Sequence, residues 1–203
     1  MTPGASVEWS IAARPLPGEA GCGDRGIVLA AAQRALAAAV DGVGHGEQAS
    51  LAADRAIQAV EAFAADDVVS VIEHCDRTLV GTRGAAISLA SFDCLRDTIT
   101  WIGVGNVEGA LLRGTSTARA GGESLLLRSG VVGHELPPLA ASTVDVRRGD
   151  LLVMATDGID HAAAGELAPV GSCAEIASAI VDRCALAADD ALVVVVRYLG
   201  ARR

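Results

Sequence analysis

Residues 35–42 read Ala-Leu-Ala-Ala-Ala-Val-Asp-Gly, and residues 151–158 read Leu-Leu-Val-Met-Ala-Thr-Asp-Gly. Each stretch predicts a core strand that delivers an aspartate, Asp41 or Asp157, and then a glycine where the strand stops. Carboxylates are costly to bury and repel one another, so this placement indicates a cation between them. Mg²⁺ and Mn²⁺ take oxygen ligands of this kind, and glycine lets a backbone carbonyl approach closely. The pair therefore predicts a metal site.

The composition is typical of a globular chain with an aliphatic core. Among the 203 residues, 51% are hydrophobic but only 2% are aromatic, so Ala, Val, Leu and Ile must fill the interior. No apolar stretch reaches the roughly 18 residues of a membrane span, and the N-terminus lacks a signal peptide's features. We therefore expect a cytoplasmic protein without membrane contact. The formal net charge of −9 argues against nucleic acid as a partner.

The order of hydrophobic patterns predicts an α+β fold with a largely antiparallel sheet system. We expect one domain over residues 6–199, flexible termini at 1–5 and 200–203, a flexible loop at 114–122 and a mobile flap at 129–142. Helices are expected over 53–64, from an N-cap at Asp66 to about residue 79, and after a capping box formed by Ser172 and Glu175. Expected strands span 6–13, 26–32, 35–40, 85–92, 97–104, 107–113, 123–127, 143–146, 150–156 and 191–198.

Further aspartates lie where strands begin or end. Asp24 follows Cys-Gly, and Asp189-Asp190 precede the last strand. Aspartate favours turns and caps, so each position alone is ordinary. Together with Asp41 and Asp157, these residues can supply the carboxylates of a binuclear metal site, one of them bridging.

Other chemical motifs are weak or absent. Gly44-His45-Gly46 precedes a helix start, which suits an anion such as phosphate, but an ordinary helix-entry loop is an equally good interpretation. A dinucleotide fingerprint fails because Glu47 occupies its last glycine position. The chain has no nucleophile elbow and no P-loop. His161, four residues after Asp157, is a candidate for supporting a metal ligand.

Six short motifs carry a family resemblance. They are Cys22-Gly23-Asp24, Asp41-Gly42-Val43-Gly44-His45-Gly46, Arg83-Gly84-Ala85-Ala86, Val104-Gly105-Asn106, Ala155-Thr156-Asp157-Gly158 and Asp189-Asp190. In order and spacing the set resembles the bacterial PP2C-type serine/threonine phosphatases of the sporulation-stage-two and sigma-regulator group, from about residue 6 to 198. The resemblance implies an αββα sandwich, with two mainly antiparallel central sheets flanked by helices. It also implies two Mn²⁺ or Mg²⁺ ions between the sheets.

The resemblance further implies a role for each acidic residue. Asp41 would bridge the two ions, and the carbonyl of Gly42 would bind one of them. Asp157 and Asp189 would bind the other ion, Asp24 would act at or near the first, and Asp190 is the less certain ligand of its pair. A metal-bridging hydroxide would then attack phosphorus in line. The implied catalytic residues are Asp41, Asp157 and Asp24, and the candidate substrate-binding residues are Gly44, His45 and Gly46.

The substrates implied by the resemblance are phosphorylated STAS-domain proteins of a stressosome or partner-switching module. Leu192 departs from the group, which usually has Thr or Ser two residues after the second Asp of the terminal pair. The basic phosphate-gripping residue of eukaryotic relatives also has no obvious counterpart. These departures leave open a catalytically silent PP2C-fold regulatory module. A nucleotide-binding protein using residues 42–46 rests only on glycine content.

Overall fold

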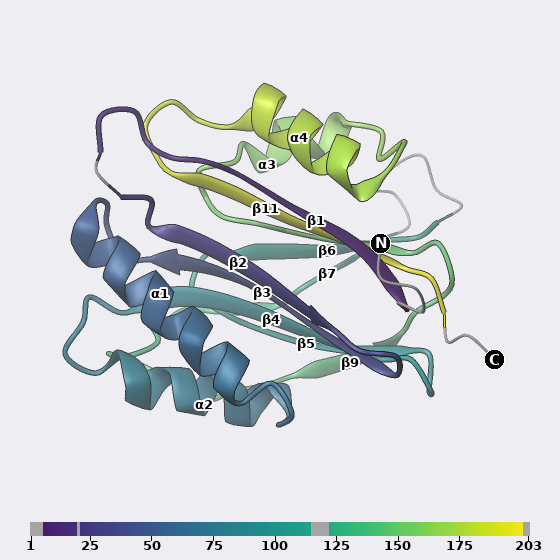
Figure 1. Ribbon diagram of the computed structural model, residues 1–203, viewed down its shortest axis with the longest axis horizontal. Helices are drawn as coiled ribbons and strands as arrows, with labels where there is room; N and C mark the ends of the chain where they lie inside the picture. Colours follow the sequence, from purple (N-terminus) through teal and green to yellow (C-terminus); the bar gives the residue numbers. More distant parts are fainter. Residues whose placement is uncertain (1–5, 20, 115–121, 201–203) are drawn as a thin grey trace.

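The computed structural model describes residues 6–19, 21–114 and 122–200. Two sheets pack face to face, with α1 and α2 outside one sheet and α3 and α4 outside the other (Figure 1). The predicted αββα sandwich is confirmed. The termini 1–5 and 201–203, and most of the predicted loop 114–122, lie outside the described residues.

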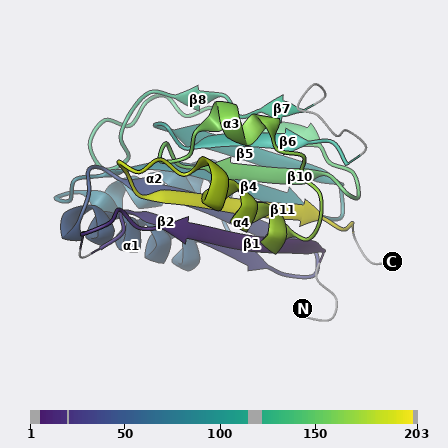
Figure 2. The ribbon, with the colours of Figure 1, turned by 90° about the horizontal axis from the view of Figure 1, so that it is seen from above.

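The first sheet joins strands from both ends of the chain. Its order is β1-β11-β10-β6-β7, and every pair in it is antiparallel. Figure 2 shows β1, β11 and β10 lying side by side. The strands are β1 (Val7–Arg14), β6 (Glu108–Leu112), β7 (Glu123–Ser124), β10 (Leu151–Ala155) and β11 (Ala191–Tyr198).

The second sheet has the order β2-β3-β4-β5-β8, and β9 also pairs with β5. Its described pairs are antiparallel except β5 with β8. The strands are β2 (Asp24–Ala30), β3 (Arg34–Gly42), β4 (Ala85–Asp93), β5 (Thr98–Val104), β8 (Leu127–Arg128) and β9 (Ser142–Asp145).

The helices are α1 (Glu47–Ala62), α2 (Val68–Leu79), α3 (His161–Glu166) and α4 (Cys173–Cys184). The capping box of Ser172 with Glu175 is present at the start of α4. The prediction of Asp66 as the α2 cap is wrong: Asp67 holds that position and accepts hydrogen bonds from the two N–H groups at 69 and 70. Helix α3 was not expected from the sequence.

Each predicted strand is present within two residues of its expected bounds, except 123–127. That stretch is divided, because the chain crosses from the first sheet to the second at Leu125. The Leu125 N–H donates to the Gly109 carbonyl at 2.8 Å, and its side chain packs in the core between the sheets. A long-range contact thus interrupts a segment that locally has the pattern of one strand.

Alternation along the strands directs specific residues into the gap between the sheets. On β3, Ala35, Ala37 and Ala39 face this gap, while the residues between them pack against α1 and α2. Continuing the same period of two brings Asp41 to the gap. On β10, Leu152 and Met154 face the gap, so the next residue on that face is Thr156.

The segment predicted as a flap is anchored at its centre. Val132 is fully buried and exchanges two hydrogen bonds with Ala85 of β4, at 3.0 and 2.9 Å. The N–H of Gly133 donates to Asp76 of α2 at 2.7 Å. This part of 129–142 is therefore tied to the second sheet and its covering helix.

Within the described ranges, none of the helices combines the length and the apolar character needed to cross a lipid bilayer.

Candidate metal centre

Five aspartates meet at one end of the sandwich, at the left of Figure 1 where β3 ends and β11 begins. Antiparallel pairing explains this, because the end of one strand lies beside the start of its neighbour. Asp24 at the start of β2 is the direct register partner of Asp41 near the end of β3. Asp157 follows β10, and Asp189-Asp190 precede β11, the strand paired with β10.

An open cleft of ≈ 560 Å³ lies over this cluster. Three of the aspartates line the cleft directly, whereas Asp24 and Asp190 lie behind it, 4% and 3% exposed. The structure thus divides the five predicted residues into an open group and a buried group. Lining residues include Asp41, Asp157, Asp189, Asn106, Gly44 and His45.

Burial and mutual repulsion raise the pKa values of several carboxyl groups in this cluster. Burial raises the pKa of Asp24 to about 8, opposed by a hydrogen bond from Thr156 and increased by the charge of Asp41. Burial raises the pKa of Asp41 to about 7, and the charges of Asp157 and Asp189 add to the effect. Burial also raises the pKa of Asp189, opposed by the hydrogen bond from the Asp190 N–H and increased by the charges of Asp157 and Asp190. No ion pair in the described ranges joins an arginine to any of the five aspartates.

Thr156 is a functional residue that the sequence analysis did not single out. Its hydroxyl donates to Asp24 Oδ2 at 2.7 Å and accepts from the Leu192 N–H at 2.9 Å. The side chain is fully buried on the inner face of the sandwich. Its place on the inward face of β10, just before Asp157, was the signal available in the sequence.

Asn106 is a second such residue. Its Nδ2 donates to Asp157 Oδ2 at 2.6 Å. The asparagine follows β5 at the same end of the sandwich and lines the cleft. It fixes one oxygen of Asp157 and leaves the other free to bind a ligand.

Asp190 forms hydrogen bonds with backbone N–H groups around the site. Its two carboxylate oxygens accept 2.6 Å hydrogen bonds from the N–H groups of Leu16 and Gly23. Its own N–H donates to Asp189 Oδ1 at 2.8 Å. These bonds tie the loop ahead of Asp24 to the start of β11, so Asp190 has a structural task whether or not it binds an ion.

Two glycines permit close backbone approaches here. A Cβ on Gly42 would lie 2.2 Å from the carbonyl oxygen of Ala49 in α1. A Cβ on Gly158 would lie 1.7 Å from the carbonyl oxygen of Asp190. Each glycine therefore lets the segment after an aspartate pack directly on a neighbouring backbone.

Only part of the Gly44-His45-Gly46 segment lines the cleft. Gly44 and His45 line the cleft, while Gly46 is the N-cap of α1 and offers no side chain to the helix N–H groups. His45 Nδ1 lies 2.8 Å from Glu19 Oε1. The free helix start and the glycine backbone remain suited to an anion.

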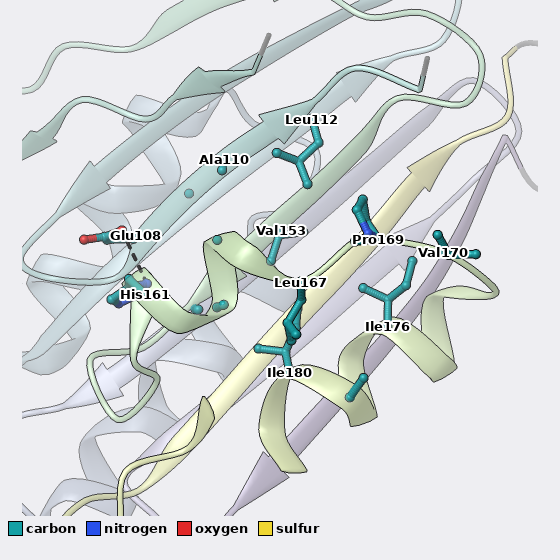
Figure 3. A pocket seen from close by; sticks show the side chains of 16 residues that line it. Glu108, Ala110, Leu112, Val153, His161, Leu167, Pro169, Val170, Ile176 and Ile180 are labelled. Carbon is teal, nitrogen blue, oxygen red and sulfur yellow. Dashed lines mark ion pairs between the residues drawn. The ribbon is translucent and has the colours of Figure 1, made fainter. Parts of the chain in front are cut away.

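His161 lies elsewhere. It begins α3, and its Nδ1 lies 3.3 Å from Glu108 Oε2 rather than beside Asp157. Figure 3 shows this pair at one end of a small apolar pocket of ≈ 80 Å³, bordered by Leu167, Ile176 and Ile180. The pocket holds no group of carboxylates, so the acidic cleft is the better candidate for chemistry.

The donor set of the cleft fits a hard divalent cation. Asp41, Asp157 and Asp189 face the same space, and the amide of Asn106 borders it. In the described part of the chain, no three acidic, histidine or cysteine side chains are close enough together to hold a metal ion by themselves, so other ligands would have to complete the coordination. An open, all-oxygen site completed by water is the arrangement that Mg²⁺ and Mn²⁺ favour.

Comparison with known proteins agrees with this site. The family model described as stage II sporulation protein E (SpoIIE) matches residues 31–199. This chain belongs to the SpoIIE family. The family match includes four of the five aspartates and the whole cleft lining, and only Asp24 precedes it.

One individual relative and two solved structures are also similar to this chain. The phosphoserine phosphatase RsbX of Bacillus subtilis (strain 168) is 29% identical over 145 residues, 70% of each chain. A chain from a structure of the bacterial stressosome, a modular system adapted to control secondary messenger signalling, has a TM-score of 0.85 and 28% identity, covering 94% of this chain and 99% of that one. RsbX in complex with magnesium has a TM-score of 0.84 and 22% identity, covering 94% of both chains, and so supports the shared fold.

Proposed function

We propose that this chain is a Mn²⁺- or Mg²⁺-dependent protein serine/threonine phosphatase. One observation carries the proposal: Asp41, Asp157 and Asp189 converge on a cleft, with raised pKa values for Asp41 and Asp189 and no ion pair to an arginine among the described residues. A cation placed among carboxylates crowded together in this way relieves their mutual repulsion. Membership of the SpoIIE family and similarity to the phosphoserine phosphatase RsbX support the choice of reaction.

In this proposal each aspartate has a distinct role. Asp41 is the register partner of Asp24 and lines the cleft with Asp157 and Asp189, which supports it as the residue that would hold both ions. The Gly42 carbonyl would help to hold the first ion, and Asp157 and Asp189 would hold the second. When bound, the ions would supply an activated water and neutralise charge on the transferring phosphoryl group.

The remaining residues orient these ligands. Thr156 fixes Asp24, and Asn106 fixes Asp157, each through one short hydrogen bond. Asp190 holds the loop that carries Asp24, through its bonds to two backbone N–H groups. A carboxylate held by such bonds loses less conformational freedom when it binds an ion.

We propose phosphorylated STAS-domain regulators as the substrates, either stressosome scaffold proteins or an anti-sigma-factor antagonist. The likeness to RsbX and to a chain from a stressosome structure supports this class. We also propose that residues 6–199 act as one domain, since β1 and β11 pair along their full length and both sheets share one core.

The test is phosphate release by the purified chain from p-nitrophenyl phosphate and from phosphorylated STAS proteins of the same genome. Activity is expected only with Mn²⁺ or Mg²⁺ and should disappear with a chelator. Asp41→Asn and Asp157→Asn should each abolish it. Asp182→Asn, an exposed change on α4, is the matched control and should keep full activity. Activity that persists in both cleft variants would rule out the proposed mechanism.

A second candidate is a catalytically silent module that keeps the fold to bind a partner. Leu192 favours it, because the family's usual hydroxyl is missing at that position. The structure supplies a hydroxyl nearby, since Thr156 bonds the Leu192 N–H and Asp24 together. Calorimetric titration with Mn²⁺ separates the candidates: no binding in the millimolar range together with no turnover would favour the silent module.

A further inference from the structure

An exposed arginine, Arg83, lies against the glycine wall of the cleft. A Cβ placed on Gly44, a cleft-lining residue, would come within 2.7 Å of Arg83 Nη1. The Arg83 side chain is exposed and makes no hydrogen bond or ion pair in ranges 6–19, 21–114 and 122–200. Its guanidinium donors are therefore available at the rim of the proposed phosphate site.

Hydrogen bonds fix the backbone around Arg83. The Val43 N–H donates to the Gly84 carbonyl at 3.0 Å, which holds Arg83 beside Gly44. The Gly84 N–H donates to the Thr82 hydroxyl at 3.0 Å, and the ring of His134 contacts the Thr82 carbonyl at 2.9 Å. The rim position of Arg83 is thus set by the fold rather than by a flexible loop.

Charge balance indicates what this arginine would bind. Two divalent cations would neutralise the carboxylates of Asp24, Asp41, Asp157 and Asp189, which leaves the charge of an incoming phosphomonoester uncompensated. His45 lines the cleft, and its Nδ1 already lies 2.8 Å from Glu19 Oε1. A guanidinium binds phosphate oxygens through two parallel N–H donors, which makes Arg83 suited to this task.

We propose that the guanidinium of Arg83 binds the phosphoryl oxygens of the substrate. The inference rests on the proposed phosphatase function and adds a residue to it. Gly44 is part of the same arrangement, because any side chain there would push into the guanidinium.

The experiment compares Arg83→Gln and Arg83→Lys with the matched control Arg148→Gln. Arg148 is exposed and precedes β10, at the end of that strand opposite the aspartate cluster. Two quantities are measured: calorimetric binding of inorganic phosphate to the Mn²⁺-loaded protein, and the kinetic constants for p-nitrophenyl phosphate. Arg83→Gln should weaken phosphate binding and raise KM by roughly 3- to 30-fold, while Arg83→Lys recovers part of the loss. Arg148→Gln should change neither.

Mn²⁺ affinity and thermal unfolding should be unchanged in Arg83→Gln, because the residue touches neither the aspartates nor the core. Phosphate binding and KM within twofold of the unaltered protein would overturn the inference. Failure of the phosphatase proposal is distinguishable, because it would appear in the unaltered chain as absent turnover. In that case phosphate binding still decides the role of Arg83: a loss in Arg83→Gln supports it, and no difference rejects it.

Discussion

Replacing Thr156 by valine removes one hydroxyl from the most buried part of the site without changing the shape of the side chain. The hydroxyl accepts from the Leu192 N–H at 2.9 Å and donates to Asp24 at 2.7 Å. A buried N–H without an acceptor costs roughly 1–3 kcal/mol. With a pKa of about 8, Asp24 is mostly protonated near neutral pH, so its lost bond counts as a neutral one, roughly 0.5–1.5 kcal/mol. We expect Thr156→Val to lower the free energy of unfolding by about 2–4 kcal/mol.

The assay is urea unfolding of the chelator-treated protein, with Thr156→Ser as the matched control. Serine keeps the hydroxyl and loses one methyl group, which costs about 1 kcal/mol. Thr156→Val should also weaken Mn²⁺ binding, because Asp24 loses the group that orients it. If valine is no more destabilising than serine, the hydroxyl does not join Asp24 to β11 and the reasoning fails.

Two further predictions concern the same end of the sandwich. Gly158→Ala should destabilise the fold by about 3 kcal/mol or more in thermal unfolding, because its Cβ would sit 1.7 Å from the Asp190 carbonyl oxygen; Gly18→Ala meets no atom within 4 Å but has a φ of +92°, so it should cost only the roughly 1–2 kcal/mol of a left-handed alanine, and equal losses would contradict the packing argument. Burial raises the pKa of Asp24 to about 8 and of Asp41 to about 7, so between pH 3.8 and those values the folded, metal-free chain binds more protons than the unfolded chain. Its stability should therefore fall as pH rises from about 5 to about 8.5, and Asp24→Asn should flatten this slope; a slope of the opposite sign in the unaltered chain would show that the carboxyls are not buried as described.

The sequence predicted the parts of the fold that depend on local pattern. Continuous apolar runs located β3 and β10, and the inner-face residues at their ends, Asp41 and Thr156, belong to the cluster at this end of the sandwich. The prediction of Asp66 as the α2 cap was wrong by one residue, because the adjacent Asp67 has the same side chain and only the observed path of the chain determines which of them caps the helix. Helix α3 is six residues long, too short for a helical period to appear in the sequence.

The sequence predicted which aspartates gather at the site. It did not predict which of them line the cleft and which hold the surrounding backbone. Nothing in the pair Asp189-Asp190 shows that the second carboxylate accepts from N–H groups 174 and 167 positions away. Nothing in the sequence shows that Arg83 lies beside Gly44, because this placement depends on the hydrogen bond between Val43 and Gly84. Contacts between residues so far apart in the sequence depend on how the strands pair in the sheets. A single short motif does not determine that pairing.

The central claim is that Asp41 organises a two-ion site that hydrolyses phosphate esters. Calorimetric titration of Mn²⁺ into the unaltered chain, Asp41→Asn and the control Asp182→Asn tests it most directly. We predict two bound ions for the unaltered chain and the control, and loss of both ions together with turnover in Asp41→Asn. Undiminished Mn²⁺ binding by Asp41→Asn, or its complete absence from the unaltered chain at millimolar concentration, would contradict the account.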